Sequence, residues 1–346
     1  MNQKQTNAEF RMLLKKKFRK IIIIAEIGVN HNGNLKIAKR LIEVAKKSGA
    51  DYAKFQMYEP EEMVTNYANK AHYQNLSVGK NITQKKMLKK YYFSEEKIKI
   101  IKKFCKKIGI KFLASVFDVK SLEKYINLKP DFIKLPSPEI NNYFLINKIK
   151  KLKNKIPIIF STGMATKKEV YNISKTLGKN NVIPMYCVSS YPTSVHEINL
   201  KKFLDFKKKY KVVGLSDHTI SIETSIICAF NEVNIIERHL TLNKKMKGPD
   251  HMSSLNPEEF KLFVDSIRNT EILRKNKNFQ NKEHKNKNFV KKFLVAKKNI
   301  KKGDKFSIKN VTCKRIGKFG VDPMLFYKIK NKKTKKNYFK DDLIRI

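Results

Sequence analysis

Cysteine is scarce in this chain, and none of it is paired by spacing. The 346 residues include four cysteines, and these are widely separated and form no Cys-x-x-Cys motif: Cys105, Cys187, Cys228 and Cys313. Such spacing argues against a disulfide framework and against a cysteine-based metal cluster. Free thiols in a reducing compartment are the favoured interpretation, and we therefore predict a cytoplasmic protein.

Long hydrophobic runs are also missing. The uninterrupted run at 21–24 has only four residues, whereas a membrane-spanning helix needs about 20. The basic segment 1–19 lacks the apolar core and the cleavage site of a signal peptide. We interpret it as a basic N-terminal extension and predict no membrane association.

Arginine and acidic residues are few, although the chain is strongly basic. Lysine and arginine number 76 against 30 acidic residues, a net charge of +46, but only eight of the basic residues are arginine. Arginine is the preferred residue for reading bases and phosphates, and no zinc-finger, helix-turn-helix or RNA-binding signature is present. The charge favours a lysine-rich solvated surface without specific nucleic-acid binding. A basic polyanion-binding protein built on an inactive barrel remains an alternative.

The sequence has instead a repeating pattern of short apolar runs, each closed by polar residues and followed by a helix-like stretch. Near-continuous apolar runs are typical of parallel strands that are covered on both faces. Eight of them predict an eight-fold (β/α) TIM barrel over 20–275, in which the carboxyl ends of the strands meet at one active-site face. The predicted strands are 21–28, 51–58, 111–117, 131–137, 157–164, 181–190, 212–218 and 234–240.

Other segments complete the predicted organisation. Residues 59–93 form an unusually long connection, which we predict to be a lid. The polar Lys/Asn-rich stretch 276–291 is predicted to be a linker, and 292–346 a small β-rich domain. Asn34 and Asn256 are predicted to cap the helices that follow them.

Two histidines lie at the ends of neighbouring predicted strands. His218 is the last residue of the seventh and His239 lies near the end of the eighth, and adjacent strands are about 4.8 Å apart. The two imidazoles are therefore expected to share a divalent cation. Together with a carboxylate such as Glu26, they suit Mn²⁺, Co²⁺, Zn²⁺ or Fe²⁺.

Two lysines interrupt the apolar runs. Lys54 and Lys134 both lie inside predicted strands, where an unpaired ammonium is costly. They indicate a clamp for phosphate or carboxylate, to which serine hydroxyls at other strand ends would add donors. The alternative is a structural salt bridge to a neighbouring carboxylate.

Eight motifs together resemble the sialic acid synthase family. The tail segments LVAKKNIKKGDKF (294–306) and CKRIG (313–317) resemble that family's C-terminal antifreeze-like (SAF) domain, so that the resemblance covers roughly residues 20–346. The barrel motifs are AEIGVNHNGN (25–34), AKFQ (53–56), FIKLPS (132–137), FSTGMAT (160–166), SSYPT (189–193), GLSDHT (214–219), IERHLT (236–241) and GPDHMSSL (248–255).

The resemblance implies an enzyme, a transferase that forms a C–C bond from phosphoenolpyruvate. It would condense phosphoenolpyruvate with an N-acetylated hexosamine, N-acetylmannosamine, to give N-acetylneuraminate and phosphate. It also implies a TIM barrel with an antifreeze-like domain, and a swapped homodimer in which one subunit's tail covers its partner's site. The implied cofactor is a divalent metal, Mn²⁺ in the first place and otherwise Mg²⁺ or Co²⁺.

The family's functional positions are matched residue by residue. His218 and His239 match the metal ligands, and with Glu26 and Lys54 they are the implied catalytic residues. Glu26 would stabilise positive charge at C2 of phosphoenolpyruvate and position the attacking water. Tyr191 and Asp250 with Gln56 and Arg315 match the sugar side, Arg315 from the partner's tail. The positions that match phosphoenolpyruvate binding are Lys54, Ser115, Lys134, Ser137, Ser161 and Ser216.

Alternatives remain within and outside this family. The product can instead be N,N′-diacetyllegionaminate or pseudaminate, made from a 2,4-diacetamido-dideoxy hexose, and GPDHMSSL leans toward the legionaminic type. Ser189 stands where some members have asparagine, which also bears on the acceptor sugar. Outside the family, a barrel aldolase with Lys134 as its Schiff-base lysine is possible.

Overall fold

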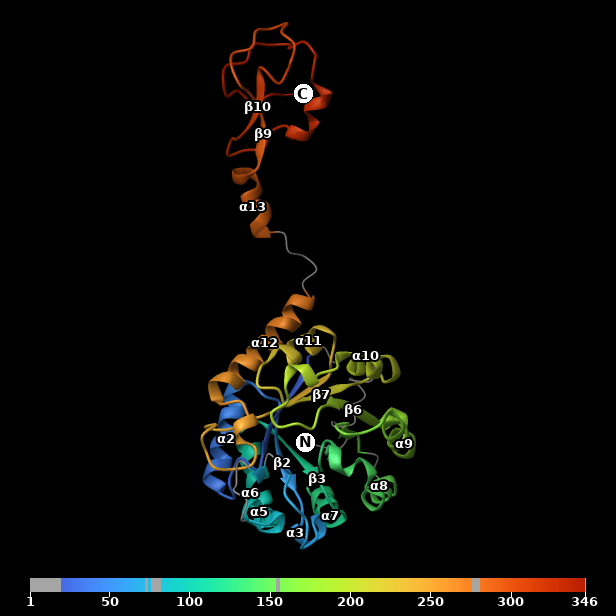
Figure 1. Ribbon diagram of the computed structural model, residues 1–346. Helices are drawn as coiled ribbons and strands as arrows, with labels where there is room; N and C mark the ends of the chain where they lie inside the picture. Colours follow the sequence, from blue (N-terminus) through green and yellow to red (C-terminus); the bar gives the residue numbers. More distant parts are fainter. Residues whose placement is uncertain (1–19, 72–73, 76–81, 154–155, 276–280, 346) are drawn as a thin grey trace. The chain divides into compact units, whose positions relative to one another are not determined.

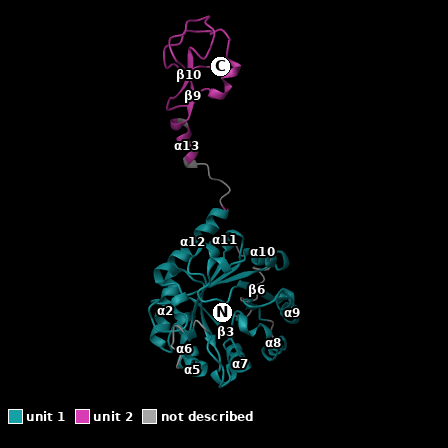
Figure 2. Ribbon diagram, in the orientation of Figure 1, with its two compact units in different colours: residues 1–274 teal, residues 275–346 magenta. Residues whose placement is uncertain are grey.

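The computed structural model describes residues 20–71, 74–75, 82–153, 156–275 and 281–345. The predicted N-terminal extension 1–19 lies outside the described residues. The chain forms two compact units, one up to Arg274 and one from Lys275 (Figure 2). Each unit is described by itself below.

The first unit is a closed barrel of eight parallel strands in the order of the sequence (Figure 1). This confirms the predicted TIM barrel. The last strand pairs with the first, with Glu26 opposite His239. The strands are β1 (Ile22–Gly28), β2 (Tyr52–Met57), β3 (Lys111–Val116), β4 (Ile133–Leu135), β5 (Ile158–Ser161), β6 (Val182–Cys187), β7 (Gly214–Asp217) and β8 (Ile235–His239).

Helices surround this barrel (Figure 1). None of the described helices is both long and apolar enough to cross a membrane. Their bounds are α2 (Leu35–Ser48), α3 (Pro60–Met63), α5 (Gln84–Tyr91), α6 (Glu95–Ile108), α7 (Val119–Asn127), α8 (Tyr143–Lys150), α9 (Lys167–Leu177), α10 (Leu200–Lys209), α11 (Glu223–Phe230) and α12 (Pro257–Lys275).

Local signals explain where several helices begin and end. The Asn34 side chain accepts hydrogen bonds from two backbone N–H groups of the first turn of α2, as predicted. Gly49 ends the helix with φ +93°, a left-handed conformation that favours glycine. At α12 the Asn256 side chain accepts from the Glu259 N–H while the Glu259 carboxylate accepts from the Asn256 N–H, at 2.9 Å each.

Strand periodicity divides the barrel interior into two levels. Side chains two residues apart on a strand point the same way, so Ile22, Ile24 and Glu26 share the interior face of β1. The lower level is a buried apolar cluster. The upper level, toward the carboxyl ends of the strands, consists of polar side chains such as Glu26. The cluster comprises Ile22, Ile24, Tyr52, Leu113, Phe132, Ile159, Ile183, Met185, Val212 and Ile235.

Part of the predicted lid is a packed helix. Within 59–93, helix α5 buries Met87, Leu88 and Tyr91, and the short helix α3 precedes it. Residues 72–73 and 76–81 of this segment lie outside the described residues. The long connection therefore contains a helix over 84–91, where apolar residues at positions 87, 88 and 91 give a helical spacing, and its role as a lid stays a prediction.

The second unit is small and has its own core. Strands β9 (Lys292–Ala296) and β10 (Val311–Arg315) pair antiparallel, and the 3₁₀ helix η5 (Pro323–Lys328) follows. Helix α13 (Asn281–Val290) occupies most of the stretch predicted to be a linker. The identity of this second unit as an antifreeze-like domain stays a prediction. The core residues are Leu294, Ala296, Ile300, Phe306, Val311, Ile329, Tyr338 and Ile344.

Candidate active site

A cavity of about 330 Å³ opens at the carboxyl ends of the barrel strands. Ser216 is buried and hydrogen-bonds to two residues of the cavity wall, Ser161 and Glu237. The structure thus brings together all the site residues predicted for the first unit. Those that line the cavity are Glu26, Lys54, Gln56, Ser115, Lys134, Ser137, Ser161, Tyr191, His218, His239 and Asp250.

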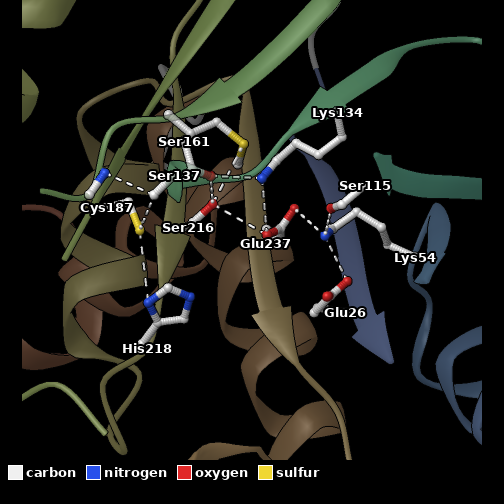
Figure 3. A network of polar contacts seen from close by, with 12 residues as sticks. Glu26, Lys54, Ser115, Lys134, Ser137, Ser161, Cys187, Ser216, His218 and Glu237 are labelled. Carbon is white, nitrogen blue, oxygen red and sulfur yellow. Dashed lines mark hydrogen bonds and ion pairs between the residues drawn. The ribbon is translucent and has the colours of Figure 1, made fainter. Parts of the chain in front are cut away.

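Lys54 is fully engaged by its neighbours. Its Nζ lies 2.8 Å from Glu26 Oε2, 2.7 Å from Ser115 Oγ and 3.5 Å from Glu237 Oε2 (Figure 3). Burial alone would lower the pKa of Lys54, but the carboxylates of Glu237 and Glu26 outweigh it and raise the pKa. Lys54 is therefore held as an ammonium ion, with three partners for its three N–H donors.

Lys134 has fewer partners. Its Nζ donates to Ser161 Oγ at 2.7 Å and to Glu237 Oε1 at 3.5 Å, and Ser161 Oγ lies 2.9 Å from Ser216 Oγ. Burial lowers the pKa of Lys134. Among the residues that the structure describes, these contacts leave one N–H of the ammonium for a further acceptor.

Glu237 lies at the centre of these contacts, although the sequence analysis assigned it no catalytic or binding role. Its carboxylate accepts from Lys134 and, at 3.3 Å, from Ser216, and it faces Lys54 (Figure 3). Burial would raise the pKa of Glu237, but the two ammonium groups outweigh it and lower the pKa. Strand periodicity was a usable signal, because Glu237 lies two residues before His239 and shares its face.

We call these residues the lysine cluster: Lys54, Lys134, Glu26, Glu237, Ser115, Ser161 and Ser216. The geometry shows the salt bridges that were the alternative interpretation of the lysines, and their role as an anion clamp stays a prediction. The two ammonium groups are salt-bridged to two carboxylates, and they also line the cavity. With two positive and two negative groups, the cluster carries no net charge of its own.

A second group lies nearer the loops, and we call it the histidine cluster: His218, His239, Tyr191 and Asp250. The imidazole centroids of His218 and His239 are 5.5 Å apart, and Tyr191 packs on His218 at 4.2 Å. Asp250 Oδ2 lies 3.9 Å from His239 Nδ1. Burial, followed by the charge of Glu26, raises the pKa of Asp250 to about 7.

The two imidazoles fit a metal ion that is open to further ligands. His218 Nδ1 lies 2.8 Å from the Val188 carbonyl oxygen, which can only accept, so Nδ1 carries a proton, and in the neutral imidazole Nε2 would be the metal-binding nitrogen. His239 Nδ1 is buried without a hydrogen-bond partner among the described residues. The expected third ligand is not supplied, because the Glu26 carboxylate is engaged by Lys54 and by Gln56. No set of three His, Cys, Asp or Glu residues in the described part of the chain is placed to hold a metal.

The two clusters are linked at Glu26, which pairs with His239 across β1 and β8, and near Cys187, whose Sγ lies 3.8 Å from His218 Nδ1. Gln56 Nε2 donates to Glu26 Oε1 at 3.3 Å. Ser137 Oγ accepts from the Gly163 N–H at 3.0 Å and lies 3.7 Å from Cys187 Sγ. A Cβ at Gly163 would lie 2.0 Å from Ser189 Oγ and 2.9 Å from Ser137 Oγ. Glycine at this position therefore allows both serines to approach the backbone.

Apolar residues form part of the cavity wall, and the sequence reasoning did not find them. They come from α3, α5 and the ends of β3 and β5, where helical or loop context hides their common direction: Met63, Met87, Leu88, Phe117 and Met164. Arg315 lies in the second unit, at the end of β10, with an exposed side chain. Its contact with a partner's sugar stays a prediction.

Comparisons with known proteins agree with this geometry. The model of the NeuB family matches residues 41–279. An N,N′-diacetyllegionaminic acid synthase of Campylobacter jejuni is 40% identical over 335 residues, which cover 94% of this chain and 99% of the relative. A pseudaminic acid synthase of the same organism is 32% identical over 329 residues, 92% of this chain and 94% of the relative.

A solved structure is also similar. The crystal structure of the N-acetylneuraminic acid (sialic acid) synthetase of Leptospira borgpetersenii, in complex with citrate, has a TM-score of 0.65 and 26% sequence identity. The match covers 78% of this chain and 92% of that chain.

Proposed function

Since this chain belongs to the NeuB family, we propose that it condenses phosphoenolpyruvate with an N-acetylated aminosugar to give a nonulosonic acid and inorganic phosphate. The observation that carries the proposal is the pair of buried ammonium groups, Lys54 and Lys134, in one cavity with two imidazoles. The two ammonium groups suit a small phosphorylated carboxylate. The two imidazoles, through a metal ion that they would hold, suit a sugar carbonyl.

We propose a 2,4-diacetamido-dideoxy hexose as the acceptor, so that the product is of the N,N′-diacetyllegionaminic type. Identity of 40% to a diacetyllegionaminic acid synthase over nearly the whole chain supports this choice. The diacetamido sugar replaces N-acetylmannosamine, which was the first choice of acceptor from the sequence motifs. The apolar residues of the cavity wall, Met63, Met87 and Met164 among them, are compatible with a deoxy sugar.

The lysine cluster would bind phosphoenolpyruvate. Lys134 has an N–H to spare, and the hydroxyls of Ser115, Ser161 and Ser216 can turn from the lysines and Glu237 to an incoming oxyanion. Because Glu26 and Glu237 already balance the two ammonium groups, the substrate must draw the lysines partly away from them. The strands hold the lysine cluster in place before the substrate binds, and such preorganised charges favour catalysis.

The reaction needs one new C–C bond and one C–O cleavage. C3 of phosphoenolpyruvate attacks the open-chain aldehyde, whose oxygen takes up a proton, and positive charge develops at C2. Water then adds to C2, loses a proton, and the C2–O bond breaks to release phosphate. Glu26, between Lys54 and Gln56, is placed to stabilise the charge at C2 and to orient the water. A divalent metal held by His218 and His239, Mn²⁺ in our proposal, would polarise the aldehyde when bound.

Phosphate release tests this proposal directly. The purified protein is incubated with phosphoenolpyruvate and either N-acetylmannosamine or a 2,4-diacetamido-2,4,6-trideoxy hexose, with Mn²⁺ and with EDTA. We expect metal-dependent release with the diacetamido sugar and little with N-acetylmannosamine. The reverse preference would move the product to N-acetylneuraminate. Silence with both sugars would contradict the enzyme assignment, and a polyanion-binding protein would then be the better interpretation.

We also propose a swapped homodimer in which Arg315 serves the partner's site. The proposal can be tested by mixing Glu26→Gln and Arg315→Ala subunits, refolded together. In a swapped dimer one site of each mixed pair combines an intact barrel with an intact tail, so activity returns. If each tail serves its own barrel, both sites stay defective and the mixture stays inactive.

A further inference from the structure

Two loops that the proposed chemistry does not use are tied together by buried polar contacts. Asn30, in the loop after β1, donates from Nδ2 to the Leu240 carbonyl at 2.9 Å and to Ser254 Oγ at 2.8 Å. The Ser254 hydroxyl in turn donates to the Asp250 carbonyl oxygen at 2.6 Å. Asn30 and Ser254 are almost completely buried. A relay therefore runs from the first loop of the barrel to the backbone of Asp250.

His251 makes a second link between the same loops. Its Nε2 lies 3.2 Å from Asn32 Oδ1 and its Nδ1 lies 2.7 Å from Thr241 Oγ1. The amide oxygen only accepts, so Nε2 carries the proton and Nδ1 accepts from the threonine hydroxyl. Burial lowers the pKa of His251 to about 4, which keeps this neutral form. A Cβ at Gly248 would lie 2.5 Å from His251 Cδ2 and 2.9 Å from Asn32 Oδ1, so glycine makes room for the link.

We call Asn30, Asn32, Thr241, His251 and Ser254 the loop brace. Between β8 and α12, all of which the structure describes, regular secondary structure is limited to the bridge of Leu240 to Leu255 and the short helix η4 (His251–Ser253). Backbone bonds near the bridge, such as Thr241 N–H to the Leu255 carbonyl at 2.9 Å, and the loop brace hold the rest of the segment. Asn30 Oδ1 is buried without a hydrogen-bond partner among the described residues. An apolar side chain would not leave such an atom, so burial alone does not account for asparagine at this position.

The brace ends at the one acidic residue of the histidine cluster. Asp250 is 6% exposed, and its Oδ2 lies 3.9 Å from His239 Nδ1. We propose that the loop brace positions the Asp250 carboxylate for the acceptor sugar, with Asn30 and Ser254 as the principal positioning residues. This inference rests on the proposed function for the role of Asp250, and it adds a second layer of residues that set the affinity for the sugar.

Kinetics of Ser254→Ala test the proposal, and Ser253→Ala is a matched control. Ser253 also donates to the Asp250 carbonyl, at 3.1 Å, but Asn30 donates to Ser254. We expect Ser254→Ala to raise KM for the sugar about tenfold while KM for phosphoenolpyruvate changes less than about twofold. Ser253→Ala should leave both constants within about twofold, and Ser254→Thr should restore the wild-type value because it keeps the hydroxyl.

A double-mutant cycle separates positioning from a general loss of structure. If the brace acts through Asp250, Ser254→Ala in an Asp250→Asn background should cause almost no further loss. Equal losses in both backgrounds, or equal rises of the two KM values, would overturn the proposal.

Hydrogen–deuterium exchange gives a readout that needs no activity. We expect faster exchange at 29–34 and 241–256 in Asn30→Ala and Ser254→Ala, and no change in Ser253→Ala. An unchanged exchange pattern would overturn the brace even in an active enzyme. If the brace is seen but no sugar is turned over by the wild-type protein, the proposed function fails and the brace does not.

Discussion

The two halves of the cavity are built differently. The lysine cluster stands on strands β1 to β5, β7 and β8, and each of its charged groups is in contact with an opposite charge. The histidine cluster combines β8 with segments that follow β6, β7 and β8, and its Asp250 and His239 remain 3.9 Å apart. The charged groups of the lysine cluster are therefore already paired with one another in the absence of a ligand. The histidine cluster depends on the loops that carry three of its four residues.

The difference indicates that the two clusters serve different substrates. A substrate common to the whole family is served best by groups that strands fix, because strands vary little. An acceptor that differs between members is served best by loop residues, which can change without disturbing the barrel. The affinity for phosphoenolpyruvate and the affinity for the sugar should therefore respond to different mutations.

The largest effect is expected from Lys134→Met in the lysine cluster. The variant loses the ammonium that carries the spare N–H and leaves the Glu237 carboxylate with less compensation. We expect kcat/KM for phosphoenolpyruvate to fall about a thousandfold, on the order of the cost of breaking a buried charged pair. Steady-state kinetics with the exposed Lys168→Met as a control measure it. An unchanged KM and kcat would remove Lys134 from the binding site.

Asp250→Asn should act on the other half alone. The carboxylate is buried beside His239, so its replacement by a neutral amide would remove the proposed carboxylate contact to the sugar. We expect kcat/KM for the sugar to fall about a hundredfold while KM for phosphoenolpyruvate stays within about twofold. Isothermal titration with phosphoenolpyruvate alone checks the second part. A matching loss of phosphoenolpyruvate affinity would show that the halves are not independent.

The loop after β1, which contains His31 and two residues of the loop brace, should make the free energy of unfolding sensitive to low pH. His31 stacks on Phe93 with centroids 3.9 Å apart, and burial, with a smaller effect of Lys97, lowers its pKa to about 3. Because this pKa lies below the ordinary value of about 6.5, the stabilisation is complete above pH 6.5 and is lost as the pH falls toward 3. Relative to His31→Gln, the wild-type protein should lose about 2 kcal/mol of unfolding free energy between pH 7 and pH 4.5. Urea denaturation of both proteins at these two pH values measures the difference, and parallel curves would contradict it.

Gly163→Ala tests the junction of the halves and should have the smallest effect. The added Cβ would collide with Ser189 Oγ and crowd Ser137 Oγ. We expect both KM values to rise by about tenfold or less. The double variant with Ser189→Ala removes the worst collision and should recover part of the loss. If only one KM changes, Gly163 belongs to one half rather than to the junction.

Strand periodicity was sufficient to predict the barrel and most of the lysine cluster. The apolar runs gave the strands, and the polar residues that close or interrupt them gave Lys54, Lys134 and the serines. Glu237 was assigned no role because its partner set, two lysines on β2 and β4, depends on closure of the barrel and not on local sequence. His218 and His239 were placed together correctly, since adjacent strands fix their separation.

Loop structure was less predictable. Helix α5 interrupts the segment taken for a lid, and its buried residues come from a helical spacing within a long polar stretch. Glu26 was suggested as a metal-binding carboxylate, which stays a prediction, and in the structure its carboxylate lies 2.8 Å from the Lys54 ammonium. Such competition between partners depends on distances that no sequence pattern contains. The tail domain and Arg315 remain predictions.

The closure of the barrel also has a consequence for synthesis of the chain. Glu26 and His239 face each other across the first and last strands, and Asn30 bonds to a serine 224 residues further on. A ribosome makes the N-terminal end first, so Glu26 and Lys54 exist long before Glu237 and Asp250 emerge. A fragment that stops short of β8 lacks Glu237, the carboxylate that faces both lysines, and it lacks the loop that carries Asp250. Truncated chains should therefore be degraded as misfolded protein rather than persist with partial activity.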